Sequence, residues 1–587
     1  MISNRDVMEM LSELVTLTTL AEESPQSFKV RAYENARLGL EADGRDVTAL
    51  TAGELIKIKG VGKATASKIR EYVDTGEVTK LRVLRQEFPF SIVELSRIPG
   101  VGPKTLKIMR AKLGIEDVES LKAAIAAEQL RTLPGLGATS EAKIAKSIER
   151  LGLSGKDRRT PIGDALPLAV RLVEFLENLP RVEQAMHCGS LRRFSETIGD
   201  IDITVASNDG PAVMAAVVAH PEADDIVVNG NTKTSFLTPA GLQVDVRVVT
   251  PEQFGAATLY FTGSKAHNIE LRQRALDRGW LLNEYGLFGA EPQDADRPIV
   301  ASVAERDIYE ALDLEFIPPP LREATGEIDA AGGDGLPELV QRAHIVGDLH
   351  YHTDRSGDGR SSVEEMVQVG IDAGYKYLAI TDHGIDLAIN GSTADEMLEH
   401  REHIARVQAD HPDIVLLWGC ELNIGASGGL DYEPDFRALF DYTVASVHSH
   451  YDQSPLDQTK RLIAAIADPT VNSIGHLSGR YIGRRPGIEF DVDVVLEALA
   501  SFDVALEVNG ALQRLDAASD VVRKAVDRGV KLVINTDSHH VSELGRMEYG
   551  VLTAQRGWAP RDLVVNTWDT AKFMAWVDGR HGLGGGA

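Results

Sequence analysis

Three aspartates near the middle of the chain stand inside apolar, strand-like runs. Asp200 and Asp202 alternate with isoleucines in residues 199–203, and Asp245 lies among valines in residues 243–249. Side chains at positions i and i+2 of a strand point to the same face, so Asp200 and Asp202 can share metal ions. Carboxylates on adjacent strands repel one another unless cations lie between them. Two Mg²⁺ or Mn²⁺ ions with oxygen ligands would relieve that repulsion and organise phosphoryl transfer.

Histidines and acidic residues form a second set of potential metal ligands in the C-terminal part of the chain. They stand at or near the ends of apolar, strand-like runs that alternate with helical patterns. Seven such runs occur, at 345–350, 377–381, 414–421, 442–447, 471–476, 504–508 and 532–536. Seven strands with intervening helices predict a βα barrel, where residues at the carboxyl ends of the strands converge. Imidazole and carboxylate groups together suit Zn²⁺, Mn²⁺ or iron.

Gly-x-Gly turns occur three times in the first 150 residues, at 59–62, 99–102 and 134–137. Each turn precedes a helical pattern, so its glycines let backbone N–H groups at a helix N-terminus approach a phosphate. This is the helix-hairpin-helix pattern, which binds the DNA backbone without reading its sequence. The predicted DNA contacts of the first two turns are Gly60, Gly62, Lys63, Lys68, Gly100, Gly102 and Lys104. The third turn either shares this role or is only structural. A P-loop is excluded because Ala64 follows Lys63.

Composition indicates an acidic protein with several globular domains. The chain has 587 residues, a formal net charge of −27 and 43% hydrophobic residues. Its two cysteines, Cys188 and Cys420, are far apart, which excludes a disulfide framework and a cysteine zinc site. No apolar run is long enough to span a bilayer, so we expect a cytoplasmic protein without a membrane partner. The acidity disfavours a polyanion partner, but residues 1–150, which contain the hairpin turns, carry 23 basic and 21 acidic residues.

The three aspartates belong to longer sequence motifs, which narrow the choice of protein family. They are, in order, GSLRRFSETIGDIDI from Gly189, VDVRVV from Val244, YFTGSKAHN from Tyr260 and GWLLNEYGLF from Gly279. These segments resemble the family X DNA polymerases, of which DNA polymerase beta is the familiar member, and the likeness extends over about residues 1–320. The resemblance implies that Asp200 and Asp202 bind both metal ions. It also implies that Asp245 binds the catalytic ion and helps to activate the primer 3′-hydroxyl.

The same resemblance implies a nucleotide pocket. Its members are Ser190, Arg193, Gly199, Tyr260, Phe261, Gly263 and Asn268. Ser190 and Arg193 match positions that hold the incoming triphosphate, a role that suits arginine because its planar fork donates two hydrogen bonds to phosphate. The aromatic pair matches residues that lie against the sugar and disfavour ribonucleotides.

Three further positions concern the base and the template. Asn268 matches the residue that reads the minor-groove edge of the base, and Arg272 matches a contact with the template strand. Gln243 departs from the family pattern, because polymerase beta has arginine two residues before the third aspartate. The surroundings of Asp245 are therefore expected to differ.

Short motifs mark the ends of five of the seven C-terminal strands. They are DLHYHT from Asp348, TDH from Thr381, SVH from Ser446, GH from Gly475 and NTDSH from Asn535. This series resembles the PHP (polymerase and histidinol phosphatase) domain, a distorted βα barrel with a trinuclear metal site, over about residues 343–575. The ligands that the resemblance implies are His350, His352, Asp358, His383, Glu421, His448, His476, Asp537 and His539. Clustered metal ions would activate water and neutralise an attacked phosphate, as in phosphoester hydrolysis.

For some basic residues the sequence is consistent with two different roles. Lys68 has the spacing of the polymerase beta lysine that forms a Schiff base with an abasic-site sugar, which requires an amine with a lowered pKa. Its alternative role is a DNA-phosphate contact. Arg480, Arg484 and Arg485 follow the strand of His476 and either meet a DNA strand end or are solvated surface charges.

These features predict α-helical N-terminal helix-hairpin-helix domains, an α+β nucleotidyltransferase palm and thumb, and a C-terminal distorted βα barrel. The predicted domains are a DNA-binding hairpin domain (1–90), a second, fingers-like hairpin region (91–150), the palm (151–250), a thumb-like nucleotide-selection subdomain (251–320), a Pro/Gly-rich linker (321–342) and the PHP domain (343–575).

The sequence therefore predicts a bacterial DNA polymerase that fills short gaps in base excision repair, a nucleoid-associated monomer with gapped or nicked DNA and dNTPs as partners. The PHP domain is expected to trim 3′ ends as a 3′–5′ exonuclease or 3′ phosphatase, and the resemblance extends to AP endonuclease activity. Two alternatives are a DNA-end-binding scaffold with structural metals and a nuclease whose polymerase core only positions DNA. The complete sets of carboxylates and metal ligands favour the enzyme with both activities.

Overall fold

The computed structural model divides the chain into two compact units. One contains Met1–Arg158 with Gly483–Arg485, and the other contains Arg159–Ile482 and Pro486–Ala587. The residues described are 4–24, 27–43, 47–96, 98, 100–150, 159–290, 297–387 and 391–582, so Pro99 of the second turn lies outside them. Among these residues, no helix combines the length and the apolar character needed to cross a bilayer.

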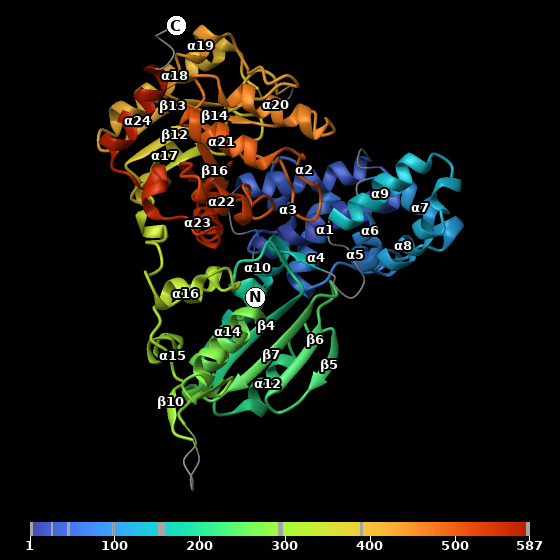
Figure 1. Ribbon diagram of the computed structural model, residues 1–587. Helices are drawn as coiled ribbons and strands as arrows, with labels where there is room; N and C mark the ends of the chain where they lie inside the picture. Colours follow the sequence, from blue (N-terminus) through green and yellow to red (C-terminus); the bar gives the residue numbers. More distant parts are fainter. Residues whose placement is uncertain are drawn as a thin grey trace. The chain divides into compact units, whose positions relative to one another are not determined.

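The first unit is built from helices around one apolar core (Figure 1). They are α1 (Asn4–Glu22), α2 (Phe28–Asp43), α3 (Ala52–Leu55), α4 (Lys63–Thr75), α5 (Thr79–Glu87), α6 (Phe90–Ser96), α7 (Pro103–Leu113), α8 (Val118–Ala126) and α9 (Ala138–Arg150). Apolar residues at helical spacing, such as Leu11 and Leu14 of α1, are fully buried in that core. The expected helical N-terminal region is confirmed.

A five-stranded sheet opens the second unit. Its strands, in the order β2-β4-β7-β6-β5, are β2 (Val182–His187), β4 (Asp200–Ser207), β7 (Gln243–Val249), β6 (Lys233–Leu237) and β5 (Asp225–Asn229). The apolar residues of β4 and β7 pack with those of α10 (Ile162–Glu177) and α12 (Gly210–Val218). The alternation along β7 turns Asp245 away from this core, because Val244 and Val246 are buried on it.

A smaller three-stranded sheet follows, with helices packed beside it. Its elements are α13 (Phe254–Thr262), α14 (Lys265–Leu276), β8 (Leu281–Asn283), β9 (Gly286–Phe288), β10 (Ile299–Ala301) and α15 (Glu305–Ala311). Residues 321–342, which we expected to be a linker, are folded onto this part. Ile328 and Ala331 of α16 (Glu327–Gly332) join its core, and the buried Glu327 carboxylate lies 2.7 Å from Nδ1 of His267.

The last part of the second unit is a nearly closed barrel of seven parallel strands (Figure 1). They are β11 (Gly347–Tyr351), β12 (Tyr377–Ile380), β13 (Val415–Asn423), β14 (Tyr442–Ser446), β15 (Ser473–Gly475), β16 (Ala505–Asn509) and β17 (Leu532–Asn535). A bridge between Tyr351 and Ser538 brings the first and last strands together. The intervening helices include α17 (Val363–Asp372), α18 (Ala394–Asp410), α20 (Pro455–Ile466), α21 (Val492–Phe502) and α22 (Ser519–Asp527), and α23 (Met547–Arg556) follows the last strand. All seven predicted strands are present, and their carboxyl ends meet at one end of the barrel.

Candidate active sites

The three aspartates of the five-stranded sheet face the same side. Strands β4 and β7 are parallel, and their register places Asp202 directly opposite Asp245 and Asp200 opposite Gln243. The short helix α11 (Gly189–Arg192) lies against them. At Gly189, which has a φ of +61°, a Cβ atom would come within 2.4 Å of Asp202 Oδ2, so only glycine lets this turn approach the carboxylate so closely.

The charges of this aspartate site, defined as Asp200, Asp202 and Asp245, are only partly compensated. Burial and the neighbouring Asp200 and Asp245 charges raise the pKa of Asp202 to about 7. Burial and Asp245 also raise the pKa of Asp200. Raised pKa values show that these carboxylates repel one another when ionised, and divalent cations bound between them would relieve that repulsion.

Two neighbours act on the third aspartate: Gln243, whose departure from the family pattern the sequence showed, and Lys233, which the sequence did not single out. Burial alone would raise the pKa of Asp245, but hydrogen bonds from Lys233 and Gln243 lower it below its usual value. Lys233 Nζ lies 2.8 Å from Asp245 Oδ2, and Gln243 Nε2 donates to Oδ1 at 2.9 Å. The cation beside Asp245 thus comes from strand β6, and Gln243 supplies a neutral donor.

Arg247 is a further neighbour of this site. Arg247 lies two residues after Asp245 on β7, so its side chain is on the same face of the strand. The alternation of side chains in the sequence would have allowed this to be predicted. The guanidinium stacks over the Phe261 ring at 4.5 Å, and both side chains line a small cavity with Asp202, Lys233 and Asp245. The predicted aromatic residue therefore borders the aspartate site.

Several predicted pocket residues lie together at α13 and α14. Tyr260, Asn268 and Arg272 line one pocket with Asn283 of β8. Asn268 Nδ2 donates to the Tyr260 carbonyl at 2.7 Å, and Arg272 Nε donates to the Asn268 carbonyl at 3.2 Å. These bonds fix the side chains that the resemblance assigns to the base and the template.

The predicted triphosphate residues lie on α11 and just after it. Ser190 belongs to α11 and Arg193 caps its end, whereas Gly199 precedes β4 with open space around it. Arg193 donates from Nη1 to the Thr262 carbonyl at 2.6 Å, and Gly263 follows that residue. The turn and the aromatic motif are thus in direct contact.

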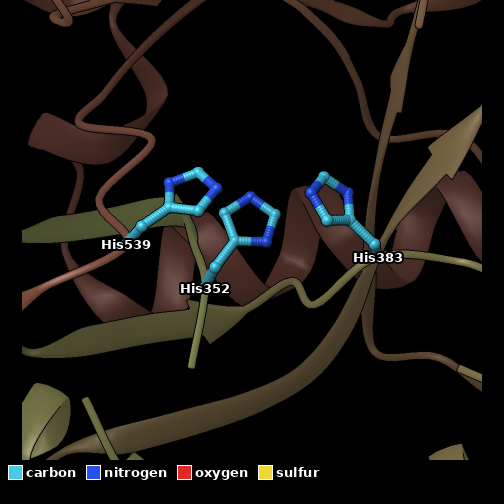
Figure 2. Close-up of side chains that lie close together, drawn as sticks. All are labelled: His352, His383 and His539. Atoms are coloured by element: carbon cyan, nitrogen blue, oxygen red, sulfur yellow. The ribbon is translucent and has the colours of Figure 1, made fainter. Parts of the chain in front are cut away.

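The nine predicted ligands of the barrel converge at the carboxyl ends of its strands; we call them the barrel cluster. Four groups of three have ligand atoms within 4.8 Å of one another: His352, His383 and His539; His350, His352 and Asp537; His350, Glu421 and His476; His383, Glu421 and His448. Figure 2 shows the rings of the first group lying side by side, although they come from three separate strand ends. Asp358, the ninth residue, lies 3.5 Å from Nε2 of both His383 and His539.

The barrel cluster has the ligand types of a metal centre, and some of its buried ring nitrogens make no hydrogen bond. His350, His352 and Glu421 are almost completely buried, yet Nε2 of both histidines makes no hydrogen bond. Buried ring nitrogens without partners are rare in proteins, and a cation between the imidazoles and carboxylates would satisfy them. These residues therefore fit metal ions.

Charge compensation inside the barrel cluster is strong. Burial would raise the pKa of Glu421, but His448, His350 and His383 hold it well below its usual value. Burial would lower the pKa of His383, yet Glu421 and Asp358 raise it to about 10. The pKa of His448, in contrast, is lowered to about 4, mainly by burial, so the histidines of the cluster do not share one charge state.

A carboxylate behind the barrel cluster orients one of its ligands. Glu507 Oε1 accepts from His350 Nδ1 at 2.6 Å, which leaves Nε2 of that ring facing the cluster. The other oxygen, Oε2, accepts from the backbone N–H of His476 at 2.6 Å. Sequence reasoning missed Glu507, although it is an acidic residue inside the apolar run of β16, the same signal that identified Asp245.

Two arginines near the barrel cluster differ in role. Arg480 is neither a strand-end contact nor a solvated charge, because it forms a two-bond ion pair with Glu196, at 2.9 and 2.6 Å, and is mostly buried. Arg514 Nε lies 3.6 Å from Asp537 Oδ2, and its buried Nη1 has no hydrogen-bond partner. Arg514 thus adds a donor at the edge of the cluster.

The hairpin turns of the first unit share one geometry. Gly60, Gly100 and Gly135 have φ of +89°, +92° and +82°, and α4 and α7 begin directly after Gly62 and Gly102. No side chain caps either helix, and no atom lies within 4 Å of a Cβ built at Gly62 or Gly102, so the N-terminal N–H groups are accessible. The predicted lysines Lys63 and Lys104 are exposed there.

Lys68, on α4, has an unusual environment. Burial lowers its pKa, Glu71 raises it, and Lys80 lowers it further. Its Nζ lies 5.7 Å from the centre of the Tyr33 ring and donates to the Ala64 carbonyl at 3.2 Å. The direction of this shift is the one that an amine nucleophile requires.

Known protein families match successive parts of the chain. A helix-hairpin-helix domain matches residues 2–78, and a SAM-like helix-hairpin-helix tandem matches residues 92–150. A DNA polymerase beta thumb matches residues 257–323, and a PHP domain matches residues 348–511. The chain thus combines domains of DNA polymerase beta type with a PHP domain.

Related proteins agree with this order. The chain is 27% identical to a probable phosphatase of Caldicellulosiruptor bescii over 227 residues, which covers 37% of this chain and 90% of the relative. A probable phosphatase of Clostridium acetobutylicum is 25% identical over 239 residues, 39% of this chain and 93% of the relative. The Bacillus subtilis protein named DNA polymerase/3'-5' exonuclease PolX is 36% identical over 566 residues, 96% of this chain and 97% of the relative. The chain therefore belongs to the PolX family, the bacterial family X DNA polymerases that carry a C-terminal PHP domain.

Proposed function

We propose that this protein is a DNA-directed DNA polymerase that fills short gaps and hydrolyses 3′ ends. The observation that carries the proposal is the presence of two different constellations for metal ions in one chain. The aspartate site lies on an open sheet face beside residues suited to a nucleotide, and the barrel cluster is a buried set of imidazoles and carboxylates. The aspartate site fits synthesis, and the barrel cluster fits phosphoester hydrolysis.

For synthesis, Asp200, Asp202 and Asp245 would hold Mg²⁺ or Mn²⁺. When bound, these cations would supply the charge that draws the primer 3′-hydroxyl and the triphosphate together. Lys233 and Gln243 keep Asp245 ionised, ready to accept the proton of the 3′-hydroxyl. The half-buried Ser190 and Arg193 would donate hydrogen bonds to the triphosphate.

The remaining pocket residues would select the nucleotide. The edge-on pair of Tyr260 and Phe261, with ring centres 5.1 Å apart, would lie against the sugar beside Gly263. Asn268 would reach the minor-groove edge of the base, and Arg272 would contact the template. The bonds from the Asn268 and Arg272 side chains to backbone carbonyls of the pocket favour one fixed pocket shape, which is the condition for rejecting a ribose 2′-hydroxyl.

For hydrolysis, the nine residues of the barrel cluster would hold Zn²⁺, Mn²⁺ or iron. These ions, when bound, would neutralise the attacked phosphate and acidify the attacking water. Glu507 fixes the ring orientation and tautomer of His350. The free Nη1 of Arg514 offers a hydrogen bond to a phosphate oxygen of the 3′-terminal nucleotide.

Gapped or nicked DNA is the proposed substrate. The exposed helix N-termini after Gly62 and Gly102, with Lys63 and Lys104 beside them, would bind the DNA backbone without sequence preference. Hydrolysis at an abasic site, as an AP endonuclease, uses the same phosphoester chemistry. A cytoplasmic, nucleoid-associated location follows from such a substrate.

A gapped-duplex assay tests the proposal. The wild type, Asp245→Ala and His350→Ala proteins are given a 5′-labelled primer in Mg²⁺ or Mn²⁺, with and without dNTPs. We expect extension to be lost only in Asp245→Ala and trimming only in His350→Ala. Extension that survives Asp245→Ala would contradict the polymerase assignment, and trimming that survives His350→Ala would contradict the assignment of the barrel. A wild type that binds the duplex but does neither would support the scaffold alternative.

The environment of Lys68 favours a second activity, removal of an abasic-site sugar. We infer that its amine, with a pKa lowered by burial, attacks the sugar aldehyde to form a Schiff base. Borohydride should trap the wild type on DNA with an incised abasic site, and Lys68→Ala should not be trapped. Equal trapping of Lys68→Ala would leave Lys68 with its alternative role as a phosphate contact.

A further inference from the structure

An arginine of the barrel reaches the turn that carries the predicted triphosphate residues. Arg556 is the last residue of α23, on the side of the barrel that packs on the five-stranded sheet. Its Nη1 donates to the backbone carbonyl of Arg193 at 2.9 Å and to Glu323 Oε1 at 2.7 Å. Arg556 is mostly buried and belongs neither to the barrel cluster nor to the aspartate site.

Glu323 stands between two arginines. The same oxygen that accepts from Arg556 also accepts from Nε of Arg193 at 2.9 Å. A triphosphate needs that guanidinium as well, since arginine binds phosphate through the same N–H groups. The Glu323 carboxylate and the triphosphate therefore compete for Arg193.

A second set of ion pairs lies beside the first one. Arg192 donates to Glu305 through two nitrogens, each at 2.8 Å, and the fully buried Arg322 donates to the same carboxylate at 2.8 Å. All three residues of the set Arg192–Glu305–Arg322 thus precede the barrel in the chain. The adjacent set, Arg193–Glu323–Arg556, ends in the barrel.

Other barrel residues hold the same turn. The ring of Tyr549, also on α23, stacks on Phe194 with centres 6.0 Å apart, and Arg480 binds Glu196. The backbone on the far side of Arg193 is therefore fixed by the barrel. With the backbone held in this way, the guanidinium must exchange its bonds to Glu323 and to the Thr262 carbonyl in order to bind a triphosphate, and the bond to Glu323 is the charged one.

We propose that Arg556 is a positioning residue for the polymerase reaction: it keeps a cation on Glu323 and so frees Arg193 for the incoming triphosphate. The proposal rests on the proposed triphosphate role of Arg193. Without Arg556, Glu323 retains one cationic partner only, and its hold on Arg193 becomes stronger. The barrel thereby sets the affinity of the polymerase for dNTPs.

Steady-state gap filling by the full chain tests this, with KM for one dNTP and kcat measured separately. Arg556→Gln should raise KM about tenfold, the size of one charge-assisted hydrogen bond, and change kcat by less than about twofold. Arg556→Lys should recover part of the loss. Glu323→Gln, alone or added to Arg556→Gln, should bring KM to or below the wild-type value, because the competing charge is gone.

Two controls separate the possible failures. The 3′-end hydrolysis of each preparation should stay at the wild-type level, which shows that the barrel is folded. Arg193→Ala should raise KM; if it does not, the proposed role of Arg193 fails. If Arg193→Ala raises KM but Arg556→Gln leaves it unchanged, or Glu323→Gln raises it, the positioning role of Arg556 is overturned. The Glu323→Gln result decides the question even if Arg556→Gln does not fold.

Discussion

The aspartate site and the barrel cluster both bring together predicted metal ligands, but they do so differently. In the barrel, eight of the nine predicted ligands fall into groups whose atoms lie within 4.8 Å of one another. Among the described residues, the three aspartates form no such group. The barrel cluster is an assembled centre, whereas the aspartate site is an open arrangement on one sheet face.

The difference extends to charge. Glu421 and Asp537 have pKa values well below their usual ones despite burial, because histidines surround them. Asp202, in contrast, has a pKa raised to about 7, and one side of Asp245 is occupied by Lys233. We therefore expect the barrel to retain metal ions between turnovers, whereas metal ions at the aspartate site would need the charge and oxygens of the substrate to complete their coordination.

The largest expected effect separates the two sites. Asp202→Asn keeps the shape of the side chain but removes a carboxylate that both metal ions would share. Polymerisation should fall at least about 10³-fold, the rate equivalent of several kcal/mol of lost charge stabilisation. Hydrolysis of 3′ ends should remain unchanged, and the exposed Asp277→Asn serves as the matched control. A fall of less than about tenfold would contradict the shared-ligand role.

A smaller effect is expected behind the barrel cluster. Glu507→Gln retains the volume but replaces an acceptor of the His350 N–H by an amide that can also donate. Metal affinity and hydrolysis should fall about 10- to 100-fold, as is usual when the partner of a metal-binding histidine is lost. A chelator titration followed by hydrolysis assays measures this, with the exposed Glu497→Gln as control. Identical titration midpoints would show that Glu507 does not orient His350.

The pH dependence should also distinguish the sites. Since the pKa of Asp202 is raised to about 7, a cation must displace a proton from this group at lower pH. At limiting Mn²⁺, the Mn²⁺ concentration for half-maximal polymerisation should rise about tenfold for each pH unit below 7. Hydrolysis of 3′ ends, measured without added Mn²⁺, should not show the corresponding loss of activity below pH 7. A flat polymerisation profile would mean that Asp202 stays ionised.

The smallest effect concerns the contact between the barrel and the sheet. Arg480→Gln breaks the two-bond pair with Glu196, and the free energy of unfolding should fall by about 1–3 kcal/mol. Urea unfolding measures the loss, and a double-mutant cycle with Glu196→Gln isolates the pair. Strict additivity in that cycle would refute a direct coupling between the two charges.

Sequence patterns predicted the parts that depend on local spacing. All seven barrel strands follow from apolar runs, and eight of the nine predicted ligands, all but Asp358, stand at or within three residues of the ends of those runs. The face shared by Asp200 and Asp202 follows from the alternation of side chains along β4. In each case the evidence lies within a few residues of the chain.

Features that depend on distant partners could not be predicted. Lys233 reaches Asp245 from a neighbouring strand in a short run that carries no distinctive pattern. The segment 321–342 has the composition of a linker, yet Arg322 finds Glu305 and Glu327 finds His267. Pairings of this kind depend on the tertiary packing, which composition alone does not contain.

The metal content of the dialysed protein tests the central comparison most directly. Wild type, Asp245→Asn and Glu421→Gln are dialysed without chelator and analysed by inductively coupled plasma mass spectrometry. We expect about three transition-metal ions per chain in the wild type and in Asp245→Asn, and a clear loss in Glu421→Gln, which removes a charge shared by two of the candidate ligand groups. A wild type without bound metal, or a loss of metal in Asp245→Asn rather than in Glu421→Gln, would contradict it.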